Sequence, residues 1–183
     1  NLAGIDADAA WRKGITGEDI VVAGQDTGYD WTHPALKPHY RGWDGTSADH
    51  DYDWHDAWDD TAIPFDDDSH GTHTMGIIVG DDGSDNRTGV APGAQWIGCR
   101  NMRRGVGTPG SYAECLEYFL APYPHGGDPF ADGDVRMSPH IVNNSWALEG
   151  TVNQCDQEFA DDIALLKEAE IAVVFSGGNY GPD

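Results

Sequence analysis

Four short apolar runs, separated by helical patterns, limit the folds open to this chain of 183 residues. Apolar and β-branched residues follow one another in these runs without polar alternation, as in strands that are buried on both faces. The runs are residues 20–24, 96–100, 141–144 and 171–175. The helical patterns are residues 72–79, 113–121 and 156–169. The sequence therefore predicts an α/β fold, with a mostly parallel sheet and helices on both of its faces.

Two polar segments interrupt this alternation. Residues 40–69 are rich in Asp, Trp and Tyr, and residues 122–139 are rich in Pro, Gly and Asp. We interpret both as long loops between elements, because neither has the character of a linker between two cores. Residues 1–183 are therefore expected to belong to a single domain.

The formal charge of −22 narrows the classes of partner. A field of this sign repels nucleic acid and anionic membrane surfaces, and no apolar run approaches the ~20 residues of a membrane span. Only three of the ten basic residues are lysines. Together these features favour a protein that is secreted into an extracellular medium.

Polar residues follow three of the predicted strands. In open parallel sheets, ligands bind beyond the carboxyl ends of the strands. Asp26 comes directly after the first run, Ser145 follows the third, and the stretch SGGN at 176–179 follows the fourth. The small residues of SGGN leave room for a substrate backbone, and Asn179 offers a side-chain amide. The sequence therefore predicts a functional site at this edge of the sheet.

The stretch DDDSHGTHTMG, residues 66–76, places His70 and His73 on one face of a predicted helix. The two histidines can be interpreted as ligands of a metal-dependent hydrolase. However, the stretch lacks the acid of the HExxH pattern, and no third ligand has a characteristic spacing. An acid–base site needs only one histidine and an orienting carboxylate, which Asp26 can supply. The residues alone leave both alternatives open.

Five motifs then point to one family. DTGYDWTHPAL, HGTHTMG, GVAPGA, NNSW and SGGN occur in the order and spacing of the subtilisin-like serine proteases, or subtilases, which the chain resembles from Trp11 to Asn179. The resemblance implies a serine endopeptidase in which Asp26 is the triad aspartate and His70 the general base. It also implies that Asn179 donates to the oxyanion and that His73 is a structural helix residue.

The resemblance assigns further residues to the binding of a peptide substrate. They are Asn144, Ser145, Trp146, Gly177, Gly178, Gly105 and Gly107. Ala147 stands where the family usually has glycine after NNSW, and its methyl group is expected to narrow the pocket for the residue that precedes the cut.

The family nucleophile lies in a GTSMA-like motif downstream of GGN, and none of the seven serines in residues 1–183 has that context. We therefore expect this chain to be the N-terminal portion of a single peptidase domain, and to be inactive alone. Its expected partners are a protein or peptide substrate and its own C-terminal portion.

Calcium is the metal that the resemblance implies, because subtilases often bind it on surface loops and hard cations take oxygen ligands. The loop after the HGTH helix offers Asp81, Asp82 and Asp85, and the acidic run at 56–68 is an alternative. A non-catalytic, calcium-binding module on the same fold remains a further interpretation.

The three cysteines have no CxxC spacing, which argues against a zinc knuckle. Cys99 lies in an apolar run and is expected to be a buried thiol. The family resemblance places the helix of Cys115 beside the loop of Cys155, and so implies a disulfide between these two residues.

Overall fold

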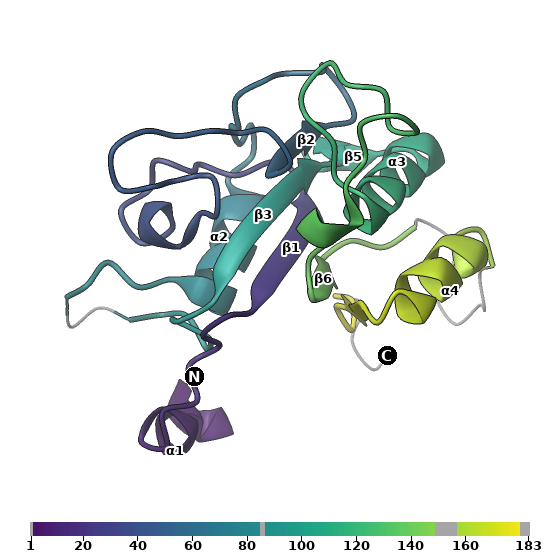
Figure 1. Ribbon diagram of the computed structural model, residues 1–183. Coiled ribbons are helices and arrows are strands. Elements are labelled where there is room, and N and C mark those ends of the chain that lie inside the picture. The colour runs from purple at the N-terminus through teal and green to yellow at the C-terminus, as the bar shows by residue number, and fades with distance from the viewer. Residues whose placement is uncertain (1, 85–86, 149–156, 180–183) are drawn as a thin grey trace.

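A five-stranded parallel sheet forms the centre of the computed structural model, which describes residues 2–84, 87–148 and 157–179 (Figure 1). The strand order is β2-β3-β1-β6-β7, and every pair of neighbours is parallel. The strands are β1 (Val21–Asp26), β2 (Trp54–Asp56), β3 (Gln95–Arg100), β6 (Ile141–Asn144) and β7 (Ala172–Phe175). The predicted α/β fold is therefore confirmed.

Helices cover the two faces of this sheet unequally (Figure 1). α2 (His70–Val79) packs on one face, whereas α3 (Pro109–Leu120) and α4 (Ala160–Glu168) pack on the other. The remaining elements are α1 (Ala7–Trp11), the antiparallel hairpin of β4 (Met102–Arg103) and β5 (Val106–Gly107), and the 3₁₀ turns η1 (Leu2–Ile5), η2 (Lys37–His39) and η3 (Val135–Met137).

The strands contribute side chains to two apolar clusters, one on each face of the sheet, because successive residues of a strand point to opposite faces. Val22 and Trp96 are partners in the β1–β3 register and pack in one cluster with Met75 of α2. Ala23 and Ile97, the next pair, belong to the cluster that contains the buried residues of α3 and α4. Uninterrupted apolar runs are thus what a sheet between two helical layers requires.

Two elements differ from their sequence-based bounds. β2 lies inside the polar segment 40–69, and its three residues are too few to show a periodicity. α3 begins at Pro109, four residues before the predicted start, because Thr108 and Ser111 form a capping box there. Proline suits the first helical position, where its missing N–H leaves no hydrogen bond unmade.

The structure corrects the disulfide prediction. Cys115 of α3 is bonded to Cys99 of β3, with a Cα–Cα distance of 5.7 Å, and Cys155 lies outside the described residues. The physical reason is the alternation along β3: Cys99 is two residues from Ile97 and therefore points to the same face, toward α3. The expectation that Cys99 is a free buried thiol was wrong for the same reason.

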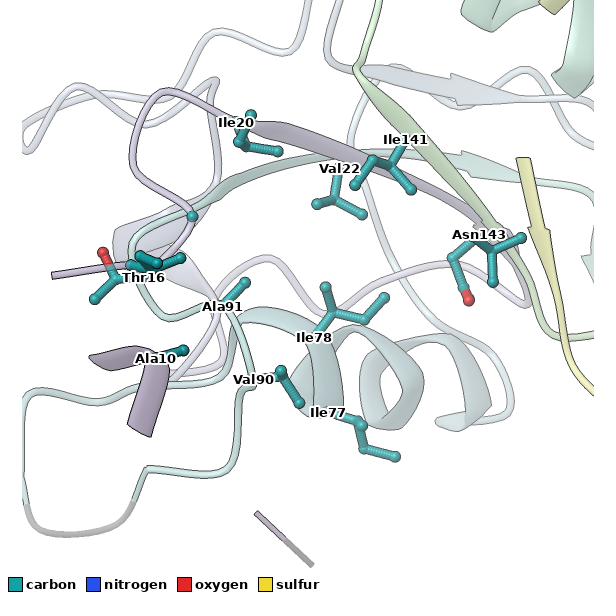
Figure 2. A pocket seen from close by; sticks show the side chains of 13 residues that line it. Ala10, Thr16, Ile20, Val22, Ile77, Ile78, Val90, Ala91, Ile141 and Asn143 are labelled. Carbon is teal, nitrogen blue, oxygen red and sulfur yellow. The ribbon is translucent and has the colours of Figure 1, made fainter. Parts of the chain in front are cut away.

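An apolar groove lies on the α2 face of the sheet (Figure 2). Its volume is about 490 Å³, and side chains of β1, α2, β6 and β7 line it. Ile77 of α2 is 49% exposed and Val174 of β7 is 50% exposed, although both are aliphatic. α2 therefore covers only part of this face. In the part of the chain that the structure describes, no helix is long and apolar enough to cross a membrane.

Candidate active site

Asp26 and His70 are in direct contact. Asp26 ends β1, His70 begins α2, and His70 Nδ1 lies 2.7 Å from Asp26 Oδ1. The Asp26 side chain is 1% exposed and that of His70 is 45% exposed. The contact that the sequence predicted between these residues is present. Among the described residues no group hydrogen-bonds to Nε2 of His70, so this nitrogen can meet a reacting group.

Gly71 allows α2 to approach β1 this closely. A Cβ atom at this position would overlap the carbonyl oxygen of Gly28 and would lie 3.0 Å from Cβ of Asp26. The Gly71 N–H also donates to Thr27 Oγ1, at 3.1 Å. The glycine of the HGTH motif therefore has a steric function, since a side chain would push His70 away from its carboxylate partner.

Asp66 fixes the start of α2 against the turn that follows β1. Its carboxylate accepts hydrogen bonds from the N–H groups of Ser69 and Thr72, both at 2.9 Å. It also accepts from Thr27 Oγ1 at 2.8 Å, which ties the helix to the residue after Asp26. These bonds satisfy N–H groups that a helix start leaves without internal partners.

Asp67 connects the loop before α2 to the end of β3. Its carboxylate accepts from Arg100 Nη2 at 2.7 Å and from the Arg104 N–H at 2.8 Å. Arg100 is 1% exposed and also binds Asp56 and Asp59, at 3.1 and 3.0 Å. Its guanidinium thus holds three acidic residues of the 56–68 run in place.

Burial raises the pKa of Asp26 above its ordinary value of 3.8, because the carboxylate loses hydration. Hydrogen bonds from His70, from the Thr27 N–H at 2.7 Å and from Thr74 Oγ1 at 3.2 Å oppose this rise in pKa. A buried carboxylate in this position holds the imidazole in one orientation and stabilises its protonated form.

A cavity of about 180 Å³ adjoins His70. Its walls come from the start of α2 and the loop before it, from the segments that follow β1, β3 and β6, and from α3. The lining residues are Thr27, Asp68, His70, Met102, Gly105, Tyr112, Ser145, Trp146 and Ala147. The structure thus brings Gly105, Ser145 and Trp146 to one cavity with His70, and Ala147 joins its wall.

Other residues assigned to substrate binding lie elsewhere. Asn144 is fully buried behind the cavity, where it accepts from Gln25 Nε2 at 2.5 Å and donates to the Val174 carbonyl at 3.1 Å. Its side chain therefore links β1, β6 and β7. Gly107 packs against the Tyr112 ring, which leaves no room for a side chain.

The segment after β7 is exposed. Gly177, Gly178 and Asn179 extend beyond the strand and do not line the cavity beside His70. Gly178 has a φ of 81°, a left-handed conformation that favours glycine. His73, on α2, is also exposed.

The acidic residues proposed for calcium are already engaged. Arg87 Nε contacts Asp81 at 2.6 Å, and Ser84 Oγ donates to Asp82 at 2.5 Å, while Asp85 lies outside the described residues. In the alternative run, the Arg100 guanidinium supplies the positive charge that a metal would bring. No group of three His, Cys, Asp or Glu residues within the described ranges is arranged to hold a metal ion.

Sequence reasoning missed several residues of this region. Arg100 orders the loop before His70, and Met102 and Tyr112 line the cavity. The Tyr112 ring stacks on Trp146 with 4.1 Å between the ring centroids, which joins α3 to the segment after β6. An arginine at the end of an apolar run was a usable signal, because such a residue needs acidic partners when it is buried.

Comparisons with known proteins agree with these motifs. Residues 17–183 match the Subtilase family. Bacillopeptidase F of Bacillus subtilis (strain 168) is 40% identical over 98% of this chain, and minor extracellular protease Vpr of the same organism is 29% identical over 98%. The structure of the prenylagaramide maturation protease PagA superposes with a TM-score of 0.61 at 18% identity, over 94% of this chain, and so supports the fold alone.

The chain spans only part of these proteins. It covers 12% of bacillopeptidase F, 20% of Vpr and 50% of the PagA chain. The family match, however, extends over most of the 183 residues, and it includes the DTG, HGTH and SGGN motifs. This chain therefore belongs to the subtilase family of serine proteases.

Proposed function

We propose that this chain is the N-terminal portion of a single peptidase domain that hydrolyses peptide bonds by an Asp-His-Ser triad. The observation that carries the proposal is the hydrogen bond from the half-exposed His70 to the buried Asp26, at the rim of a cavity. Membership of the subtilase family supports the reaction class.

In this mechanism, Nε2 of His70 accepts the proton of a serine hydroxyl as the serine oxygen attacks the scissile carbonyl carbon. The imidazolium later donates the proton to the leaving amine. Asp26 holds the proton of Nδ1 in place and stabilises the imidazolium charge. We assign the side-chain amide of Asn179 to the developing oxyanion.

The serine in this proposal lies outside residues 1–183. Ser145 lines the cavity, but its hydroxyl accepts from Asn143 Nδ2 at 2.9 Å. Among the described residues, no serine hydroxyl hydrogen-bonds to His70. Residues 1–183 alone are therefore proposed to be inactive, with the C-terminal portion of the same domain as their partner.

We place the peptide substrate between two segments, that of Gly105 and that of Ser145–Ala147, because both line the cavity beside His70. Gly177 and Gly178 are proposed to give the substrate backbone access to Asn179. A Cβ atom at Gly177 would meet no atom of a described residue within 4 Å, so those residues leave space beside this segment.

A serine-directed fluorophosphonate probe tests the proposal on a longer protein that contains this segment. We expect labelling in the parent protein and its loss in the His70→Ala variant, since the serine then lacks its base. Turnover that a chelator abolishes, without labelling, would favour a metal-dependent hydrolase. Neither labelling nor turnover would favour a non-catalytic module and contradict the proposal.

Calcium binding remains a prediction, and the described residues do not support the loop at 81–85 as its site, since Arg87 already neutralises Asp81. Thermal melting in calcium and in a chelator provides the test. An increase of the melting temperature in calcium supports a structural site elsewhere, and equal melting temperatures contradict the prediction.

We further propose that the protein is secreted. The charge of −22 and the Cys99–Cys115 disulfide support this, because disulfides persist in oxidising compartments. The relatives do not decide the question, since an extracellular protease and a major intracellular serine protease are both among them. Detection of the protein in culture medium, with the disulfide formed, is the expected result.

A further inference from the structure

Among the described residues that line the cavity beside His70, Asp68 is the one acidic residue, and none is a lysine or arginine. Thr27, Met102, Gly105, Tyr112, Ser145, Trp146 and Ala147, which also line the cavity, are uncharged. A ligand group that enters this cavity therefore meets a single negative charge close to the histidine of the proposed triad.

The two preceding aspartates are engaged with the fold, whereas the Asp68 carboxylate has no partner among the residues that the structure describes. Asp66 accepts hydrogen bonds from the start of α2, and Asp67 binds Arg100. For Asp68, only the backbone N–H is engaged, as a donor to Asp66 at 3.1 Å. No ion pair or hydrogen bond joins its carboxylate to any described residue, so its charge is available to a ligand in the cavity.

The walls around Asp68 suit a long cationic side chain. Met102, Tyr112 and Trp146 can contact the aliphatic stem of a lysine or arginine, while the carboxylate binds the charged end. A Cβ atom at Gly105 would lie 4.0 Å from Asp68 Oδ2, so the Gly105 backbone passes close to the carboxylate. Arg103 does not fill this place, because it lies 3.7 Å from Asp59.

We propose that Asp68 is a specificity-determining residue, which selects a lysine or arginine side chain close to the scissile bond of the substrate. This inference rests on the proposed peptidase function and names a substrate class for it. Asp68 would repel an acidic substrate side chain in this cavity, so the cavity discriminates between substrate side chains by the sign of their charge as well as by their size.

Peptide binding to the 183-residue chain tests the inference without hydrolysis. Fluorescein-labelled hexapeptides carry lysine, norleucine or glutamate at each position in turn, and fluorescence polarisation gives the dissociation constants. We expect lysine to bind about tenfold more tightly than norleucine at one position, with glutamate the weakest. The preference should shrink as salt is added, because the pair is partly exposed.

Three variants test whether the charge of Asp68 causes this preference. Asp68→Asn is expected to bring the lysine to norleucine ratio close to one, and Asp68→Lys to invert the order of lysine and glutamate. Asp19→Asn is the matched control: it removes the same charge from an exposed residue that precedes β1, at the opposite end of this strand from Asp26, and should keep the preference. Binding that is independent of charge at every position, or an absence of binding, overturns the inference.

Kinetics in a longer, active protein separate this inference from the proposed function. The expected result is a higher kcat/KM for the lysine peptide, with a ratio to norleucine that falls about tenfold in Asp68→Asn. Hydrolysis that ignores this charge would refute the role of Asp68 and leave the peptidase proposal standing. If nothing is hydrolysed, the peptidase proposal fails, and the binding constants decide the role of Asp68.

Discussion

Reduction of the Cys99–Cys115 disulfide is expected to lower the free energy of unfolding by about 3 kcal/mol. The two cysteines are 16 residues apart in the sequence. Closure of a loop of this length removes about 10 cal/mol/K of entropy from the unfolded chain, which is about 3 kcal/mol at 25 °C. Both residues are fully buried, so the reduced folded state keeps nearly the same packing, and the effect falls on the unfolded state.

Urea unfolding, followed by tryptophan fluorescence, measures this loss in the oxidised and reduced protein. With a slope of roughly 2 kcal/mol/M, the midpoint should fall by about 1.5 M on reduction. The double variant Cys99→Ala/Cys115→Ala is the control, since its midpoint should not respond to the reductant.

A tryptic map should first establish the pairing. The expected linked product joins the peptide of residues 88–100, which contains Cys99, to that of residues 105–136, which contains Cys115. A link from either of them to the peptide of residues 137–167, which contains Cys155, would refute the assignment. Equal urea midpoints in a protein with the mapped bond would refute the entropic reasoning.

Four further outcomes are expected. Arg100→Met should destabilise the fold by about 3–5 kcal/mol in urea unfolding, because three carboxylates lose their buried partner, and a loss below 1 kcal/mol would contradict this. Asn179→Ala in a longer, active protein should lower kcat by a factor of about 10²–10³ with little change in KM, as loss of one oxyanion donor does in subtilisin. An unchanged kcat would show that SGGN is only a turn. Burial raises the pKa of Asp53 from its ordinary value of 3.8 to about 6, so the folded state binds this proton more tightly than the unfolded state does. Stability should therefore fall as the pH rises from about 4 to about 6, and Asp53→Asn should flatten that part of the pH profile of stability. The 183-residue chain should self-associate in sedimentation experiments through its apolar groove, and Ile77→Glu should weaken the association; a monodisperse parent monomer of 19.8 kDa at every concentration would refute it.

The sequence by itself determined the parallel sheet and the central pair of the candidate site. Apolar runs without alternation specify strands covered on both faces, and this information is local, so β1, β3, β6 and β7 were predicted within one or two residues. The contact of Asp26 with His70 followed from the family resemblance, because the DTG and HGTH motifs assign these two residues to one triad.

The tertiary structure alone decided the disulfide pairing and the roles of the individual aspartates before α2. Cys99 is bonded to Cys115 because one face of β3 packs against α3, and the spacing of the cysteines along the chain does not encode this contact. The three consecutive aspartates look alike in sequence, yet Asp66 caps a helix, Asp67 binds the buried Arg100, and Asp68 faces a cavity. Such differences arise because burial and hydrogen-bond partners, which set the function of a carboxylate, depend on neighbours that only folding brings together.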